Sequence, residues 1–300
     1  MRIAVTGGLG RLGRLVVESL LPDHDAVAID QAPADPALPS VQADVRDPAA
    51  LRAALSGAEV VIHIGGIDRS VAAPDPATLQ TNVVGTWNAF AASRDAGVRR
   101  VVLCSSTAVT GIDQSNPGMP PDYLPIDEDH ALRPTDAYSV SKRAAELVAE
   151  GFARGTTLEV LTLRPAFIAF PAMRGFMAGK AMKAGRSAGE HGREEPMPLL
   201  RAYVGPADCA HAFALAATAA YPGFAAMFVA ADDCFADQPT VRRVEALYGT
   251  QVPLRDAELY ANWPSASTIA SGRAKRLLAW RPTTRWPDLM EGASDCAGAV

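Results

Sequence analysis

The chain of 300 residues is 49% hydrophobic and carries a formal net charge of -5, with 28 Lys and Arg residues against 33 Asp and Glu residues. This apolar content is enough for one large domain or a nucleotide-binding domain with a smaller lobe. The acidic balance, without a long basic run, argues against a nucleic-acid or anionic-membrane surface. The expected partner is therefore a small-molecule substrate, not nucleic acid or a membrane.

The first predicted element is a short apolar strand, Arg2–Thr6, which leads into the turn GGLGRLG at residues 7–13 and then into a helical pattern. In this order, glycines allow a tight turn and close backbone approach, and the helix N-terminus presents free N–H groups to a pyrophosphate. The alternative is a glycine turn that serves packing alone. We predict a dinucleotide site with contacts from Gly7, Gly10, Arg11, Leu12 and Gly13.

The second predicted strand, Ala26–Ile29, ends at Asp30, about twenty residues after the glycine turn. A carboxylate at this place can accept hydrogen bonds from the adenosine ribose hydroxyls, and it repels a 2′-phosphate. Asp30 therefore favours NAD over NADP, although Arg11 brings a positive charge into the same region.

A third strand is predicted at Val41–Ala43, followed by Asp44, and a helix at Pro48–Leu55 with Asp47 as its N-cap. Asp44 is a candidate for contact with adenine, and ordinary strand-end capping is the alternative.

The continuous apolar run Glu59–Ile64 predicts a fourth strand, in which His63 is more simply a hydrogen-bonded core residue than a catalyst. Gly65 and Gly66 follow it, and glycines at the end of a strand let the backbone approach a ligand. Gly65 is therefore a further candidate for cofactor contact.

Thr78–Ala96 predicts one long helix and Arg99–Cys104 a fifth strand, which ends in Ser105-Ser106-Thr107. Strands and helices that alternate at this length indicate a parallel sheet with helices on both faces. Such sheets bind ligands at their carboxyl edge, so a hydroxyl there can bond to a substrate oxygen. A simple strand-end turn is the alternative. The connection Thr110–Thr135 is long enough to be functional.

A helix predicted over residues 136–154 opens with AYSVSK, in which Tyr138 and Lys142 stand four residues apart on one helical face. A fixed cation beside a phenol favours the phenolate form, so the two side chains can act as an acid–base couple. Alone the pattern is weak, because an exposed pair on an amphipathic helix has the same spacing.

Leu158–Arg164 predicts the sixth strand. The segment Cys209–Ala231 is uncharged and long enough to span a bilayer, but Pro222-Gly223 interrupts it. We predict a buried helix, Ala207–Ala220, followed by a buried strand, Phe224–Ala230.

The cysteines are scattered and form no CxxC pair, which favours buried reduced thiols over disulfides or a zinc site. No cluster of metal ligands is evident, and the first residues run into a strand without a secretion signal. We therefore expect a cytoplasmic protein without a metal. The four cysteines are Cys104, Cys209, Cys234 and Cys296.

Together the motifs resemble the extended short-chain dehydrogenase/reductase family, which includes the NAD-dependent epimerases and dehydratases. The matching stretches cover nearly the whole chain in the family's order. They are TGGLGRLG (6–13), Asp30, ADV (43–45), VIHIGG (61–66), NVVGT (82–86), SSTAVTG (105–111), YSVSK (138–142), LRP (163–165), YVGPADCA (203–210) and KRLLAWRP (275–282).

The resemblance implies an α/β fold with a Rossmann-type, doubly wound parallel sheet and a smaller C-terminal substrate lobe. The NAD-binding domain would comprise residues 1–164 and 202–231, and the lobe 165–201 and 232–300. The resemblance also implies cofactor contacts for the glycine turn, Asp30, Asp44 and Val45, and it places Asn82 near the active-site water or the cofactor.

The same resemblance assigns catalytic roles to Ser106, Tyr138 and Lys142. Tyr138 would be the acid or base, Lys142 would favour its phenolate form and hold the nicotinamide ribose, and Ser106 would orient the reacting substrate oxygen. Thr107 is the alternative to Ser106.

After LRP the chain departs from the nucleotide-sugar members of the family. LRPAFIAFP (163–171) stands where they have LRPxNVYGP, and GEHGREEPMPLLRAY (189–203) replaces a glycine-rich stretch that helps them hold a nucleotide diphosphate. The loop 121–134 and the ending 280–289 resemble the uronate-dehydrogenase-like branch, which oxidises unactivated sugar acids. Cationic residues here can bind an anion or form a solvated surface: Arg174, Lys180, Lys183, Arg186, His191, Arg193 and Arg201.

Three hypotheses follow, in order of preference. The first is an NAD-dependent oxidoreductase that transfers a hydride between nicotinamide and a hydroxyl or carbonyl carbon of a sugar, sugar acid or similar small alcohol. The second is a nucleotide-sugar epimerase or dehydratase in which NAD is recycled in place. The third is a non-catalytic dinucleotide-sensing protein, against which the catalytic set argues. Helices 78–96 and 136–154 resemble the pair through which relatives dimerise, so we expect a homodimer.

Overall fold

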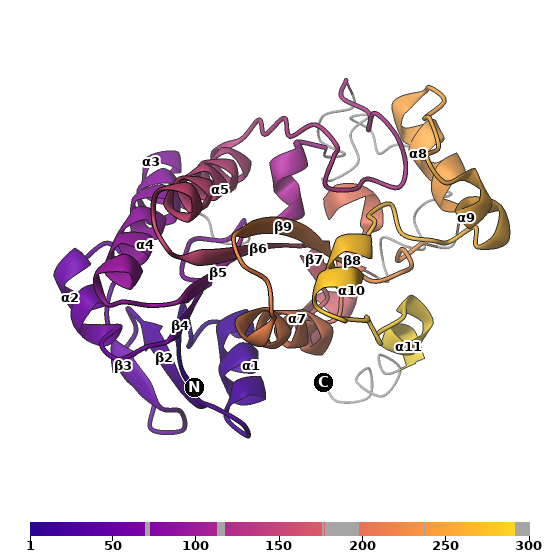
Figure 1. Ribbon diagram of the computed structural model, residues 1–300. Helices are drawn as coiled ribbons and strands as arrows, with labels where there is room; N and C mark the ends of the chain where they lie inside the picture. Colours follow the sequence, from indigo (N-terminus) through magenta and orange to yellow (C-terminus); the bar gives the residue numbers. More distant parts are fainter. Residues whose placement is uncertain (70–72, 113–117, 176, 178–197, 237, 292–300) are drawn as a thin grey trace.

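The computed structural model describes residues 1–69, 73–112, 118–175, 177, 198–236 and 238–291. Its centre is a parallel seven-stranded sheet in the order β3-β2-β1-β4-β5-β6-β9 (Figure 1). The predicted doubly wound sheet is thereby confirmed. Its strands are β1 (Arg2–Thr6), β2 (Asp25–Asp30), β3 (Ser40–Gln42), β4 (Val60–His63), β5 (Arg100–Cys104), β6 (Glu159–Pro165) and β9 (Phe224–Val229).

Helices cover both faces of this sheet, and each face has its own apolar core. Strand β4, with the sequence VVIH, is buried at every residue, as expected of a central parallel strand. Helices α1 (Arg11–Leu20) and α7 (Pro206–Thr218) cover one face, and Ile62 packs in the core beneath them. Helices α2 (Pro48–Ala54), α4 (Gly85–Asp95) and α5 (Ala137–Gly155) cover the other face, and Val61 packs in the core beneath them.

The single α-helix predicted over 78–96 is wrong in its regularity. The helical run begins earlier, with α3 (Asp75–Leu79), and passes through a π-helical turn, η1 (Gln80–Val84), before α4. Within this wide turn Asn82 points inward and hydrogen-bonds to Ile67 and Ser141. These long-range bonds accompany the π turn, and hydrophobic periodicity does not encode them.

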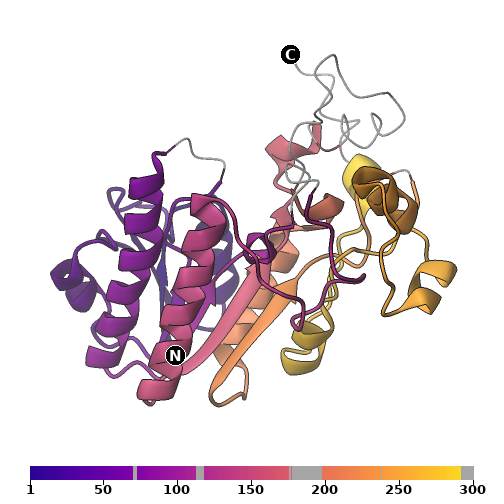
Figure 2. The same ribbon diagram turned by 90° about the horizontal axis from the view of Figure 1, so that it is seen from above.

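Smaller elements lie beside the carboxyl half of the sheet, and Figure 2 shows the C-terminal helices grouped away from the N-terminal half. Strand β7 (Phe167–Ile168) pairs in parallel with β8 (Tyr203–Val204), outside the main sheet. Three 3-10 turns are η2 (Thr107–Thr110), η3 (Pro171–Met173) and η5 (Pro198–Arg201). The remaining helices are α8 (Thr240–Tyr248), α9 (Ala257–Asn262), α10 (Gly272–Leu277) and α11 (Trp286–Glu291).

The connection between β5 and α5 packs onto these C-terminal segments. Leu124 forms a bridge with Leu254, and Ile126 forms one with Ile269. Both Leu124 and Ile126 are fully buried in a third apolar core with residues of α8 and α9. This connection therefore packs between the sheet and the C-terminal helices and holds them together.

The segment Cys209–Ala231 contains most of α7 and the whole of β9, as predicted. Across the described residues, no helix is both long and apolar enough to cross a membrane. Cys104, Cys209 and Cys234 are buried free thiols, while Cys296 lies outside the described residues.

Candidate active site

A cavity of about 780 Å³ follows the carboxyl edge of the sheet. Its walls are the glycine turn, the residues just after β2, β4 and β5, the first turns of α5, and the segment that follows β6. This is the edge at which doubly wound sheets bind ligands.

The glycine turn has no room for side chains at Gly7, Gly8 and Gly13; a Cβ on Gly8 would lie 2.6 Å from the Ala28 Cα. A Cβ on Gly13 would lie 2.0 Å from the Gly7 carbonyl oxygen, and one on Gly7 would lie 2.8 Å from the Gly65 backbone. Gly7 also has a φ of +69°, which glycine adopts without strain. Helix α1 has no side-chain N-cap and no acidic residue in its first turn, so its N-terminus suits an anion such as a pyrophosphate.

Asp30 lies at the end of β2 and is held by the backbone. Its Oδ2 accepts a hydrogen bond from the Leu9 N–H and its Oδ1 accepts one from the Ala32 N–H, each at 3.1 Å. The carboxylate therefore has a fixed orientation beside the glycine turn. Arg11 forms an ion pair with Asp68 at 3.0 Å. The Asp68 carboxylate therefore balances the positive charge of Arg11, which would otherwise favour the 2′-phosphate of NADP.

The other predicted cofactor residues divide into two groups. Asp44, Val45 and Gly65 line the cavity, and Arg46 lowers the pKa of Asp44, chiefly through a side-chain hydrogen bond. Asn82 is 2% exposed and does not line the cavity. Its carboxamide instead holds the loop after β4, through the N–H and carbonyl of Ile67.

Tyr138 and Lys142 project from the beginning of α5 into the cavity. Asp136 caps this helix by accepting a hydrogen bond from the Ser139 N–H at 3.0 Å, in a capping box. The cap fixes the turn that carries Tyr138. Lys142 donates a hydrogen bond to the Cys104 carbonyl at 2.9 Å, and its Nζ lies 5.9 Å from the centre of the Tyr138 ring.

Ser106 reaches the same cavity from the end of β5. Its Oγ accepts a hydrogen bond from the Ala108 N–H at 3.1 Å and so caps η2. The hydroxyl hydrogen therefore remains free to be donated to a ligand oxygen. Thr107 also lines the cavity but is 5% exposed. Ser106, Tyr138 and Lys142 are thus brought together from two elements.

His63 is a core residue, as predicted, and not part of the cavity wall. Its ring nitrogens lie 2.7 Å from the Thr6 hydroxyl and 3.1 Å from the Thr86 hydroxyl. Burial, and next the charge of Lys142, lowers the pKa of His63 to about 3. The imidazole is therefore neutral at physiological pH.

Several cavity residues were not foreseen from the sequence. Arg69 forms an ion pair with Asp136 at 2.6 Å, and its guanidinium lies 5.5 Å from the Tyr138 ring centre. The only local signal for Arg69 was its place just after a strand-end glycine pair. The segment after β6 lines the cavity with the apolar side chains of Phe167, Ile168, Phe170 and Met173. The Arg11 guanidinium of the glycine turn lies 5.0 Å from the centre of the Phe170 ring.

Of the cationic residues considered for anion binding, Arg201 is 3% exposed, and Arg174 directly follows η3. Neither lines the cavity. The rest of this group lies outside the described residues: Lys180, Lys183, Arg186, His191 and Arg193.

The model of the NAD dependent epimerase/dehydratase family matches residues 3–224. The chain belongs to this family. The resemblance seen in the motifs from TGGLGRLG to LRP is thereby confirmed.

Two curated relatives of this family member are sugar dehydrogenases by name. The chain is 35% identical over 168 residues to an L-arabinose 1-dehydrogenase (NAD(P)(+)) of Haloferax volcanii, covering 54% of the chain and 65% of the relative. It is 36% identical over 152 residues to a uronate dehydrogenase of Agrobacterium fabrum, covering 49% and 54%. Each match spans less than two thirds of the relative's length.

Solved structures show the same fold along the whole chain. A short-chain dehydrogenase/reductase superfamily protein from Agrobacterium tumefaciens, solved with bound NAD, has a TM-score of 0.71 at 23% identity and covers 99% of this chain and 97% of its own. A UDP-galactose 4-epimerase has a TM-score of 0.69 at 24% identity, with 99% of both chains covered.

Proposed function

We propose that the protein is an NAD-dependent oxidoreductase that acts on a hydroxyl or carbonyl carbon of a sugar, a sugar acid or a similar small alcohol. One observation carries this proposal: a single cavity joins the glycine turn to Ser106, Tyr138 and Lys142. The cofactor and the acid–base group would then meet in one space. The curated relatives, two of them dehydrogenases of sugars or uronates by name, support the same substrate class.

The residues fit NAD at each part of the cofactor. The close-packed turn around Gly7 and Gly13 would admit a pyrophosphate against the backbone at the start of α1. Asp30 would accept hydrogen bonds from the adenosine ribose, which favours NAD over NADP. Asp44 and Val45 would lie against the adenine, with Gly65 between them and the glycine turn. Lys142 would hold the nicotinamide ribose.

Bound NAD would supply the hydride acceptor, and the protein would handle the proton. Ser106 would donate its hydroxyl hydrogen to the reacting substrate oxygen and so fix its position. Tyr138 would take the proton from that oxygen during oxidation and return it during reduction. Lys142, whose ammonium lies 5.9 Å from the Tyr138 ring centre, would stabilise the phenolate that this requires.

The test is a screen of free sugars, uronic acids and nucleotide sugars, in which NADH absorbance is followed with added NAD. Net NADH formation with an unactivated sugar or uronic acid is the expected result. No NADH with any member of the panel, from protein that binds NAD, would refute net oxidation.

A nucleotide-sugar epimerase that recycles NAD is the second candidate. The observation that favours it is a match over 94% of this chain and 91% of a UDP-glucose 4-epimerase of Corynebacterium glutamicum, at 26% identity. It would convert its substrate without net NADH, so product analysis of the same screen distinguishes it from a dehydrogenase.

We also propose that residues 1–164 and 202–231 serve the cofactor, whereas 165–201 and 232–300 serve the substrate.

We further propose a homodimer formed through α3, α4 and α5. Five large apolar side chains are exposed on this helical run and on α5: Leu79, Val84, Trp87, Val140 and Leu147. A second copy of the chain would cover them, as in the helix pairing that the family resemblance implies.

Leu147→Glu tests the dimer, because Leu147 is 54% exposed and a charge there would oppose burial at the interface. Sedimentation should give twice the chain mass for the unsubstituted protein and one chain mass for the variant, with little change in monomer stability. A monomeric unsubstituted protein would refute the proposal.

The free buried thiols Cys104, Cys209 and Cys234 support a reducing, cytoplasmic location.

A further inference from the structure

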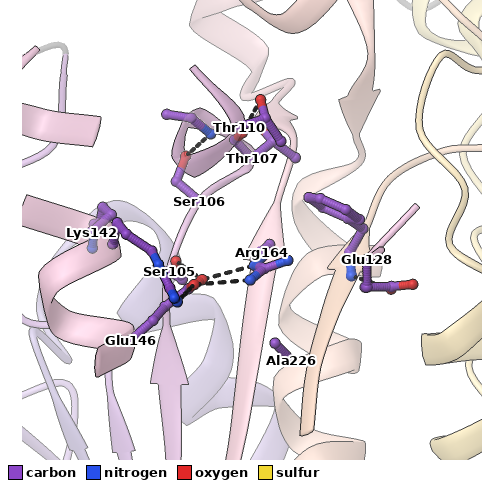
Figure 3. A network of polar contacts seen from close by, with 12 residues as sticks. Ser105, Ser106, Thr107, Thr110, Glu128, Lys142, Glu146, Arg164 and Ala226 are labelled. Carbon is purple, nitrogen blue, oxygen red and sulfur yellow. Dashed lines mark hydrogen bonds and ion pairs between the residues drawn. The ribbon is translucent and has the colours of Figure 1, made fainter. Parts of the chain in front are cut away.

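A buried polar cluster lies next to Ser106 and Lys142, two of the three proposed catalytic residues (Figure 3). At its centre is Glu146, a fully buried carboxylate on α5. Its Oε1 accepts hydrogen bonds from the Ser105 hydroxyl at 2.6 Å and from Arg164 Nε at 2.8 Å. Its Oε2 accepts from Arg164 Nη2 at 2.9 Å and from Arg143 Nη1 at 3.2 Å. One side chain thus connects α5 with the ends of β5 and β6.

The spacing of these bonds relates them to the site. Glu146 follows Lys142 by four residues and Tyr138 by eight, so the three side chains share one face of α5. Two consecutive residues at the end of β5 bond to that face. The Cys104 carbonyl accepts from Lys142, and the Ser105 hydroxyl donates to Glu146. Ser106 is the next residue.

Arg164 extends the same connection to the neighbouring strand of the sheet. It lies on β6, and the following residues Pro165 and Ala166 line the cavity. The Ser105 N–H donates to the Leu163 carbonyl at 2.8 Å, which continues the pairing of β5 with β6 up to this point. Helix α5 and both strand ends are therefore held in one fixed arrangement.

Stability alone does not account for this cluster. Desolvation of a buried ion pair offsets most of its attraction, so apolar side chains of similar size would hold the elements at least as well. Arg164 Nη1 is buried and has no hydrogen-bond partner among the described residues, which adds a further cost. What a bidentate, charge-assisted pair provides that apolar packing does not is a defined direction and distance.

The buried pair of Glu146 and Arg164 has no net charge with which to act on Tyr138 from a distance. Arg143 bonds to Glu150 at 3.1 Å as well as to Glu146. Glu150 in turn bonds to Arg154 at 3.1 Å. Arg143, Glu150 and Arg154 are all more exposed than Glu146. Any influence on the site is therefore through position.

We propose that Ser105, Glu146 and Arg164 are positioning residues, which set the placement of Ser106 relative to Tyr138 and Lys142. The role rests on the proposed function, because it is for that acid–base step that the three groups must be aligned. Loss of the Ser105 hydroxyl would remove the side-chain bond that ties the end of β5 to α5, between the carbonyl that holds Lys142 and the backbone that carries Ser106.

Ser105→Ala is the sharpest test, since it removes one oxygen and leaves the ion pair in place. Its matched control is Ser93→Ala, because Ser93 is also fully buried and donates to the Ala89 carbonyl at 2.7 Å, but on α4 and away from the cavity. We expect Ser105→Ala to lower kcat by roughly tenfold or more. KM for NAD should stay within about twofold of its original value, and the acidic limb of the pH profile should move. Ser93→Ala should leave all three unchanged.

A readout without substrate separates this inference from the proposed function. The absorbance change on phenolate formation, taken as the difference from Tyr138→Phe, gives the titration midpoint of Tyr138 in the folded protein. We expect Ser105→Ala to raise this midpoint, because the strand end that holds Lys142 is fixed less closely to α5. If the unsubstituted protein turns over no substrate, the proposed function fails, yet the midpoint still decides the positioning role.

Glu146→Gln, with Glu150→Gln as its control, provides the second variant. Glu146→Gln should lower kcat more than Ser105→Ala does, and Glu150→Gln should leave it unchanged, because Glu150 does not bond to either strand end. If Glu146→Gln does not fold, Ser105→Ala alone decides. An unaltered kcat, pH profile and Tyr138 midpoint in Ser105→Ala would overturn the proposal, even if its stability is reduced.

Discussion

The two walls of the cavity are made of different parts of the polypeptide. The wall beside β1, β2 and β4 consists of main-chain turns, packed so closely that a Cβ on Gly13 would lie 2.0 Å from the Gly7 oxygen. The second wall, which follows β6, consists of side chains, among them Phe167, Phe170 and Met173, and it meets the first where Arg11 lies 5.0 Å from the Phe170 ring centre. These side chains follow β6 on a two-residue strand and a 3-10 turn outside the main sheet.

This difference indicates how the two ligands would be selected. The first wall is continuous with the buried sheet, so a change there disturbs the fold and the cofactor site together. The second wall can change its side chains without altering the pairing of the seven strands. We therefore expect cofactor choice to depend on the backbone and on Asp30, and substrate choice to depend on side chains that can be exchanged.

The largest loss of activity is expected from a change at Tyr138, which lines the cavity from the beginning of α5. Tyr138→Phe removes the hydroxyl that we propose as the acid or base, while the ring and its contacts stay. We predict a loss of kcat of about a thousandfold, with NAD affinity nearly unchanged. Steady-state kinetics and calorimetric titration with NAD measure the two quantities. A variant that keeps most of its activity would end the proposed acid–base role.

Gly13→Ala tests the main-chain wall directly. Because the new Cβ would meet the Gly7 carbonyl at 2.0 Å, the turn must open, and we predict that NAD binding is lost or weakened by at least about a hundredfold, roughly 3 kcal/mol. Gly151→Ala is the control, since no atom lies within 4 Å of its added Cβ and it sits inside α5. That change should stabilise the protein by about 1 kcal/mol. Equal NAD affinity in both variants would contradict the close-packed turn.

Asp30→Asn tests whether one charge at the edge of this wall decides between NAD and NADP. Asparagine keeps an oxygen for the Leu9 N–H but removes the negative charge. We predict that the preference for NAD over NADP falls by roughly tenfold or more. Asp25→Asn, at the exposed opening residue of the same strand, is the control. Dissociation constants for both cofactors provide the measurement, and an unchanged ratio would refute the role of Asp30.

Local signals were enough to predict much of the first wall. Strand β1, the glycine turn, Asp30 at a strand end and Asp47 as an N-cap each depend on neighbouring residues, and the structure places each where the sequence indicated. The third strand is one residue earlier than predicted, at Ser40–Gln42.

The features that were not predictable join residues far apart in the chain. Asn82 bonds to Ile67 and Ser141 across 15 and 59 positions, and Arg11 pairs with Asp68 across 57. No local pattern encodes such pairs, because they exist only once the sheet has assembled. The π turn at Asn82 belongs to the same class.

The last expected effect is on stability and not on catalysis or binding. It concerns the core behind the main-chain wall, where His63 lies between Thr6 and Thr86. Its pKa in the folded protein is about 3, against an ordinary value of 6.5. Below pH 6.5 the unfolded chain therefore binds a proton that the folded protein does not. The stability that neutral His63 contributes is full above pH 6.5 and is lost as the pH falls toward 3.

His63→Gln should remove this dependence while keeping an amide that can bond to both threonine hydroxyls. Relative to the variant, the unsubstituted protein should lose about 1.4 kcal/mol of unfolding free energy per pH unit below 6.5, or roughly 2 kcal/mol by pH 5. Urea denaturation at several pH values measures the difference, in which all other titrations cancel. His211→Gln, at an exposed position of α7, is the control. If the stability curves of the His63 variant and the unsubstituted protein run parallel, the core behind the glycine turn tolerates a charge. The first wall would then not rest on a core that excludes charge, and a main reason for contrasting it with the second wall would be lost.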